Sequence, residues 1–264
     1  MIDIHSHILP FFDDGAQTWD ESLVMARQAY EDGIRIIIAT PHHYNGRYIS
    51  NPSSVLESVE VFNAKLNEEE LDVTILPGQE IRLNDDLLKL WDEGELMLLN
   101  DSRYMLLEFP SSHVPDKAEE LVYELSLLGI HAVIAHPERN AEIVRDPQRL
   151  RGLVELGALG QLTAQSVTGD RGSKLQKISL DLCKDSLVHF IAADAHDPVR
   201  RPFRLAQSYK MIEEKLGTAV ANYYQENAVR LTRNEAIPTL DIQTRRLGLS
   251  RLSKVFSSMF GLSR

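Results

Sequence analysis

Short runs of apolar and β-branched residues alternate with amphipathic stretches along almost the whole chain. Most of these runs are nearly continuous in apolar residues, which is typical of strands that are buried on both faces. The stretches between them carry helix-start signals, such as Thr18 with Glu21 three residues later and Asn51 before Pro52. The alternation predicts an α/β fold of β/α units around a parallel sheet. The seven predicted strands are residues 2–5, 35–40, 73–76 running on to 80, 104–108, 132–135, 158–163 and 188–193.

The first 240 residues are predicted to form one domain, because no low-complexity or Ser/Gly-rich stretch divides them. Residues 241–264 differ in charge, since they contain five basic residues and one acidic residue, whereas the 264-residue chain has a formal net charge of −11. Their apolar residues recur at helical spacing, at positions 252, 255, 256, 259 and 260. We expect a basic amphipathic tail that packs on the domain or on a neighbouring subunit. Peripheral contact with an acidic membrane surface or partner is the alternative.

Composition excludes several classes of protein. The excess of 39 Asp and Glu over 28 Lys and Arg disfavours a protein that binds nucleic acid electrostatically. The longest apolar runs, such as residues 36–39, are far shorter than the ~20 residues of a membrane span. The amino terminus shows no secretory signal, and a single cysteine, Cys183, excludes an intramolecular disulfide framework. We therefore expect a cytoplasmic protein with no nucleic-acid partner and no stable membrane insertion.

Side chains that can bind metal ions stand at the carboxyl end of almost every predicted strand. In a parallel β/α barrel the loops at this end converge on one mouth, where functional residues gather. His5 with His7, and Asp194 with His196, are spaced two residues apart, so each pair faces one way on an extended strand. Glu108 and Asp194 each follow an apolar run, and a carboxylate buried there needs a cation or strong donors. The full set is His5, His7, Asp14, His42, Glu80, Glu108, His136, Asp194 and His196.

The donor types in this set favour particular ions. Five imidazoles and four carboxylates without a thiolate suit Mn²⁺, Fe²⁺ or Zn²⁺. Nine ligands exceed the coordination of one ion, so the set implies two or three ions bridged by carboxylates. Clustered divalent ions can hold a hydroxide and neutralise a phosphate during in-line displacement. The other histidines, at 43, 113, 131 and 189, lie outside the strand-end pattern and are interpreted as structural.

Arginines near two of these strand ends indicate phosphate binding. Arg139 follows His136 by three residues, and Arg200 and Arg201 follow His196 closely. A guanidinium group can bind two phosphate oxygens at once and offsets the charge of phosphoryl transfer. For Arg139, the alternative is a surface ion pair with an acidic neighbour at 138, 142 or 146. A purely surface role is also the alternative for Arg200 and Arg201.

Other phosphatase and acyl-transfer chemistries have no matching motif in the chain. A thiolate phosphatase has an arginine six residues after its cysteine, but His189 stands at that distance from Cys183. The chain has no Gly-x-x-x-x-Gly-Lys-Ser/Thr loop and no Gly-x-Ser-x-Gly elbow. Cys183 is therefore interpreted as a buried structural thiol.

Six motifs occur in order along residues 1 to about 230: DIHSHILP at 3–10, DDG at 13–15, ATPHH at 39–43, GQE at 78–80, HPER at 136–139 and DAH at 194–196. As a set they resemble the bacterial metal-dependent protein-tyrosine phosphatases of the polymerase-and-histidinol-phosphatase superfamily, which are associated with capsular and exopolysaccharide synthesis. The resemblance implies a distorted seven-stranded β/α barrel and three divalent ions, with manganese expected. It also implies that the nine residues above are the ligands and that Arg139 holds phosphate. Arg201, which precedes Pro202, is chosen as the second arginine.

The same resemblance implies hydrolysis of phosphotyrosine on a bacterial tyrosine kinase that controls capsule or exopolysaccharide synthesis. A hydroxide bridging the ions would attack phosphorus opposite the tyrosyl oxygen, while the two arginines take up charge. A small-molecule phosphomonoesterase, such as a histidinol-phosphate phosphatase, is the alternative enzyme, and the acidic balance disfavours a nuclease. The remaining alternative is a metal-stabilised regulator that binds the phosphorylated kinase without turnover. The sequence leaves the oligomeric state open.

Overall fold

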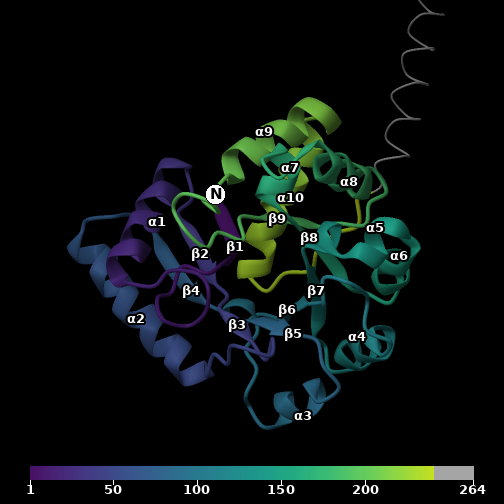
Figure 1. Ribbon diagram of the computed structural model, residues 1–264, viewed down its shortest axis with the longest axis horizontal. Helices are drawn as coiled ribbons and strands as arrows, with labels where there is room; N and C mark the ends of the chain where they lie inside the picture. The colour runs from purple at the N-terminus through teal and green to yellow at the C-terminus, as the bar shows by residue number, and fades with distance from the viewer. Residues whose placement is uncertain (241–264) are drawn as a thin grey trace, which may run out of the picture.

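The computed structural model describes residues 1–240, which form a ring of strands with helices around it (Figure 1). The β-strands are β1 (Ile2–Ser6), β2 (Ile36–Ala39), β3 (His42–His43), β4 (Thr74–Pro77), β5 (Glu80–Arg82), β6 (Tyr104–Glu108), β7 (His131–Ala135), β8 (Leu159–Thr163) and β9 (Phe190–Ala192). The α-helices are α1 (Trp19–Glu31), α2 (Pro52–Glu68), α3 (Leu87–Asp92), α4 (Ala118–Leu127), α5 (Ala141–Arg145), α6 (Gln148–Glu155), α7 (Ala164–Thr168), α8 (Ser173–Lys184), α9 (Leu205–Leu216) and α10 (Thr218–Thr232). The predicted basic tail at 241–264 lies outside the described residues.

All strand pairings are parallel, and the strands close into a barrel. One sheet has the order β1-β2-β4 and the other has the order β3-β5-β6-β7-β8-β9. β2 and β3 are two parts of one interrupted strand, as are β4 and β5, so the ring has seven strand positions. A parallel bridge between Ser6 and Ala195 joins the end of β9 to β1 and closes it. The structure confirms the predicted α/β barrel of seven strands.

The prediction of one continuous strand from residue 73 to 80 is wrong, because the strand is interrupted between β4 and β5. The neighbouring strand breaks too, at Pro41, whose missing N–H cannot continue a ladder of hydrogen bonds. Gly78 lies in the second break, where a Cβ would be 2.9 Å from a methyl of Ile38. Beyond the two interruptions the strands pair again as β3 and β5, with His42 opposite Glu80. The interruption therefore places two candidate metal-binding residues side by side.

The barrel interior is filled with apolar side chains at its amino end. The cluster there includes Ile4, Leu106, Val133 and Phe190. Leu231 of α10 packs against them. The outward faces of the strands pack against the surrounding helices in a second, larger core. Figure 1 shows α1 and α2 on one side of the ring and α4, α5 and α6 on the other. Because the amino end is packed, polar side chains inside the barrel are confined to the carboxyl-end mouth.

Within residues 1–240, no helix combines the length and the apolarity needed to cross a membrane.

Candidate metal centre

A β-bulge in β1 turns two histidines toward the barrel mouth. The pairing register with β2 shifts between Asp3 and Ser6, so that β1 holds one extra residue there. Ile4 points into the interior core, and His5 after it is also directed inward, where its Nε2 lies 3.3 Å from Nε2 of His7. A bulge re-aims side chains in this way because it puts consecutive residues on one side of a strand. The prediction that His5 and His7 face the same way is confirmed.

Glu80 lies at the centre of the cluster and is fully buried. Its Oε2 is 3.4 Å from Nε2 of His5, 3.2 Å from Nε2 of His7 and 2.9 Å from Nδ1 of His42. Its Oε1 is 2.8 Å from Nε2 of His136. One carboxylate from β5 thus contacts imidazoles from β1, β3 and the end of β7, which is the arrangement that a bridging ligand requires.

Two more carboxylates hold the outer part of the cluster together. Oδ1 of Asp14 is 3.6 Å from Nε2 of His42 and 3.7 Å from Nε2 of His196. Oε2 of Glu108 is 3.7 Å from Nδ1 of His42, and it forms an ion pair with a guanidinium nitrogen of Arg82 at 2.9 Å. Donor atoms in three overlapping groups lie within 4.8 Å of one another: His7, Asp14, His42 and His196; His5, His7 and Glu80; His42, Glu80 and Glu108.

Asp194 joins this cluster to the two predicted arginines. Its Oδ1 lies 3.6 Å from Nε2 of His5 and 3.5 Å from Nε2 of His7. Its Oδ2 is 2.8 Å from a guanidinium nitrogen of Arg139 and 2.8 Å from one of Arg201. Burial alone raises the pKa of Asp194, but the two guanidinium groups hold that pKa well below its usual range. The structure therefore brings all nine predicted metal residues and both arginines to one mouth, and their roles as ligands stay a prediction.

The arginine contacts decide between the alternatives left open by the sequence. Arg139 pairs with Asp194 inside the mouth and not with an acidic neighbour on the surface. The side chain of Arg200 is 88% exposed and its ion pair is with Asp197 at 3.8 Å. Arg201, which is one-quarter exposed, is thus the arginine placed at the site.

Three imidazoles are held so that their Nε2 atoms can bind a cation. Nδ1–H of His5 donates to Oε1 of Gln161 at 2.8 Å, and Nδ1–H of His7 donates to Oδ2 of Asp13 at 2.6 Å. Nδ1–H of His196 donates to the backbone oxygen of Asp194 at 3.0 Å. Metal-binding histidines usually donate their second ring N–H to an oxygen in this manner, because the bond fixes the tautomer and the ring orientation.

Several atoms that face one another in the cluster make no hydrogen bond. Among the described residues, Nδ1 of His42, Oε2 of Glu80, Oε2 of Glu108 and Nε2 of His196 are buried without a hydrogen-bond partner. Buried carboxylate oxygens and imidazole nitrogens of this kind are costly unless a cation or a donor satisfies them. The residues present therefore fit a site for more than one divalent cation.

Sequence reasoning missed three residues that support the cluster: Asp13, Gln161 and Arg82. Besides His7, Asp13 accepts from the backbone N–H groups of Gly15 and His42, each at 2.8 Å. Gly15 packs so tightly that a Cβ there would lie 2.1 Å from the backbone oxygen of His7. A signal was present for Gln161, which is a polar residue inside an apolar strand, and for Arg82, which is two residues beyond Glu80 on the same strand face.

Replacing Asp13 with alanine is expected to weaken Mn²⁺ binding by about 10- to 100-fold, because His7 loses the acceptor that orients its ring. Isothermal titration of the metal-free protein with Mn²⁺ measures the change. Asp85→Ala is the matched control, since the Asp85 side chain is 74% exposed and pairs with Lys117 outside the cluster. Equal Mn²⁺ affinity of Asp13→Ala and the control would contradict this orienting role.

His43, His189 and Cys183 have structural surroundings. His43 accepts a backbone N–H through Nδ1, and His189 does the same. Burial lowers the pKa of both to about 4, so both are neutral at neutral pH. Among the described residues, neither these two nor His113 and His131 belong to a metal-binding group. Cys183 is buried, and burial raises its pKa to about 12, which leaves the thiol unreactive.

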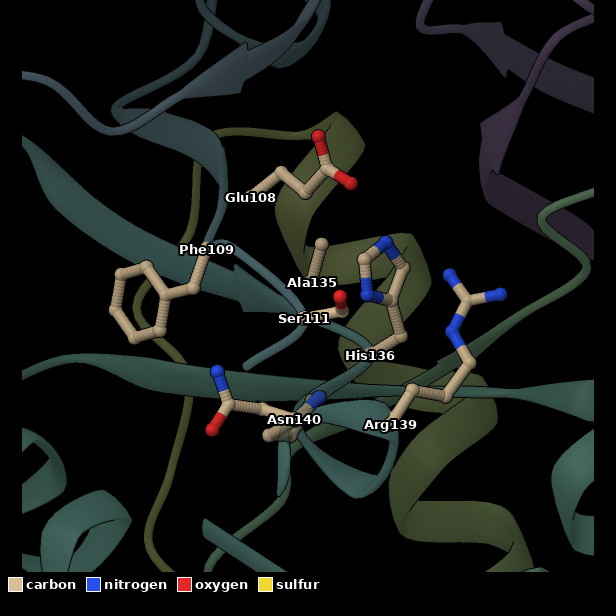
Figure 2. A pocket seen from close by; sticks show the side chains of 8 residues that line it. Glu108, Phe109, Ser111, Ala135, His136, Arg139 and Asn140 are labelled. Atoms are coloured by element: carbon tan, nitrogen blue, oxygen red, sulfur yellow. The ribbon is translucent and has the colours of Figure 1, made fainter. Parts of the chain in front are cut away.

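A pocket of about 250 Å³ opens beside the cluster (Figure 2). Its lining includes Glu108, Phe109, Ser111, His136, Arg139 and Asn140. Figure 2 shows Phe109 on one side of the pocket and His136 with Arg139 on the other. A ligand in this pocket would therefore lie next to Glu108 and His136 of the cation-binding cluster.

The chain belongs to the CpsB/CapC family of capsular polysaccharide synthesis, whose members include metal-dependent tyrosine-protein phosphatases; the family model matches residues 1–233. Tyrosine-protein phosphatase YwqE of Bacillus subtilis is 44% identical over 250 residues, which cover 94% of this chain and 98% of YwqE. Tyrosine-protein phosphatase CpsB of Streptococcus pneumoniae is 31% identical over 226 residues, 84% of this chain and 93% of CpsB.

A solved structure has the same fold. It comes from crystal structures of YwqE from Bacillus subtilis and CpsB from Streptococcus pneumoniae, described as metal-dependent tyrosine phosphatases. Its TM-score is 0.89 at 44% sequence identity, and the match covers 91% of this chain and 98% of that chain. The predicted family and barrel fold are confirmed.

Proposed function

We propose that this chain hydrolyses phosphotyrosine on a bacterial tyrosine kinase that controls capsule or exopolysaccharide synthesis. The observation that carries the proposal is the position of Asp194, whose two oxygens face different groups. One oxygen faces the imidazole cluster, and the other is held by Arg139 and Arg201. A cation-binding cluster and two guanidinium groups thus lie on opposite sides of one carboxylate, as a site for a phosphoryl group requires.

Three divalent ions, with Mn²⁺ expected and Fe²⁺ or Zn²⁺ as alternatives, would be held by the nine residues of the cluster. When bound, such ions supply a hydroxide nucleophile at neutral pH and stabilise the negative charge of the phosphoryl oxygens. Glu80 and Asp194 would be among the residues that hold the ions, since each contacts more than one imidazole. Gln161 and Asp13 keep the rings of His5 and His7 in position for this role.

Arg139 and Arg201 are assigned to the phosphoryl oxygens. Both are only about one-quarter exposed, so their charges act in a site that is partly shielded from water. Guanidinium groups fixed there before the reaction stabilise the charge of the transition state without reorganisation. The pocket beside Phe109 would take the tyrosine ring. Because the leaving phenol has a pKa of about 10, the reaction has less need of a general acid, and we assign none.

Metal removal and substrate comparison test this function together. Protein stripped with a chelator is expected to lose activity and to regain it with Mn²⁺, and more weakly with Fe²⁺ or Zn²⁺. With Mn²⁺, phosphate release is expected to be faster from a phosphotyrosine peptide than from histidinol phosphate, and absent from single-stranded DNA. Faster release from histidinol phosphate would identify a small-molecule phosphatase. No release from any substrate would identify a protein that binds phosphotyrosine without turnover.

A further inference from the structure

Arg139 separates the pocket of Figure 2 from a second pocket that the mechanism does not use. The second pocket has a volume of about 400 Å³ and lies between the loop after β7 and helix α8. Its lining includes Arg139, Arg171 and Lys174, together with the apolar side chains of Leu175 and Ile178. It therefore combines two positively charged residues from outside the metal cluster with an apolar wall.

The positive charges of Arg171 and Lys174 are available to bind an anion. Within residues 1–240, neither Arg171 nor Lys174 has a carboxylate within ion-pair distance. Other basic residues of the same region are paired, since Lys177 and Lys184 both contact Asp181. An arginine and a lysine without a carboxylate partner among the described residues thus line one pocket.

Arg171 is held in place at the edge of this pocket. Its Nε donates to Oε1 of Gln165 at 3.1 Å, and Gln165 is buried. This bond uses one of the five N–H donors of the guanidinium group and leaves the others for a ligand. Burial lowers the pKa of Arg171, and the charges of Arg139 and Arg201 lower it further, while the carboxylates of Asp194 and Glu138 oppose this shift.

Among the described residues, Glu138 is the one acidic residue that lines the pocket, and its carboxylate is directed into the core. Glu138 is fully buried, and its Oε1 accepts from the backbone N–H of Thr163 at 3.0 Å. The pocket thus presents the charges of Arg171 and Lys174 to its solvent side, with only one acidic residue beneath them. The local charge is positive although the chain as a whole is acidic.

We propose that this second pocket binds the carboxylate of an acidic residue near the phosphotyrosine of the substrate. The inference rests on the proposed function, because Arg139 borders both the pocket for the ring and the pocket for the acid. An extended peptide advances ~3.4 Å per residue, so the acidic side chain would stand one or two positions from the phosphotyrosine. Leu175 and Ile178 would contact its methylene groups, and Arg171 with Lys174 would bind its carboxylate.

Two phosphotyrosine peptides that differ only in Glu or Gln at the four positions around the phosphotyrosine test this subsite. The wild-type protein with Mn²⁺ is expected to have a kcat/KM about 2- to 5-fold higher for the Glu peptide, an advantage of the size that partly exposed ion pairs give. The difference should lie mainly in KM, because the contact is remote from the reacting atoms. Raising the salt concentration should reduce it.

The double variant Arg171→Gln with Lys174→Gln is expected to hydrolyse the two peptides with equal kcat/KM. Lys177→Gln is the matched control, since Lys177 lies on the same helix, is 81% exposed and pairs with Asp181; it should keep the wild-type preference. Equal rates for both peptides with wild-type protein, or a preference that survives the double variant, would overturn the subsite and leave the proposed function standing. Failure to hydrolyse either peptide would overturn the proposed function itself.

Discussion

Glu80→Gln is expected to lower kcat for a phosphotyrosine peptide by about a thousandfold. Glu80 contacts four imidazoles through its two oxygens, so its neutral amide analogue removes the charge that would bridge the ions. Bound ions contribute several kcal/mol to transition-state stabilisation, and about 4 kcal/mol corresponds to about three orders of magnitude in rate. Steady-state phosphate release at saturating Mn²⁺ measures the loss, and elemental analysis of the same sample should show fewer ions per chain.

The control for this variant is Glu60→Gln on the exposed face of α2. It should retain wild-type activity and metal content. Circular dichroism and thermal unfolding of both variants show whether the barrel is intact, because the apolar interior at the amino end does not involve Glu80. If folded Glu80→Gln protein keeps activity within about twofold of the wild type, the central position assigned to this carboxylate is wrong.

Arg139→Ala and Arg201→Ala are each expected to lower kcat/KM for the peptide by about 100- to 1000-fold, the range for a preorganised donor that stabilises transition-state charge. Both side chains bind the same oxygen of Asp194 and would share one phosphoryl group. Their effects should therefore not add, and the double variant is expected to be little worse than either single variant. Steady-state kinetics on all three variants measures this.

Arg145→Ala and Arg200→Ala are the matched controls, because Arg145 is exposed on α5 and the Arg200 side chain is 88% exposed. Both should stay close to the wild type. A large loss in Arg200→Ala together with a small loss in Arg201→Ala would reverse the choice between these two arginines.

The positions of most candidate metal residues could be predicted because they stand at or just after a strand end, with Asp14 in a loop as the exception. The carboxyl ends of parallel strands meet at one mouth whatever the details of the strands between. Glu80 illustrates this, since it was placed correctly although its strand is interrupted after Pro77. The choice of Arg201 over Arg200 came from the family resemblance and stays a prediction, although Arg201 is the one of the two that contacts Asp194.

Features that arise from contacts between distant parts of the chain could not be predicted. Gln161 holds His5 across 156 residues of sequence, and no spacing in the chain indicates that pair. The bulge in β1 is a change of register, which the periodicity of apolar residues does not record. Arg171 and Arg139 line one pocket although 32 residues separate them in the sequence, so their nearness follows from tertiary packing.

Anomalous diffraction at the manganese absorption edge, from crystals of the protein grown with Mn²⁺, shows directly whether the barrel mouth holds a cluster of metal ions. Three anomalous peaks are expected there, all within coordination distance of the nine residues, with Glu80 and Asp194 each next to more than one peak. Elemental analysis of the same protein should give about three ions per chain. A mouth without anomalous peaks, in protein that hydrolyses phosphotyrosine, would show that these residues do not form the metal site of the enzyme.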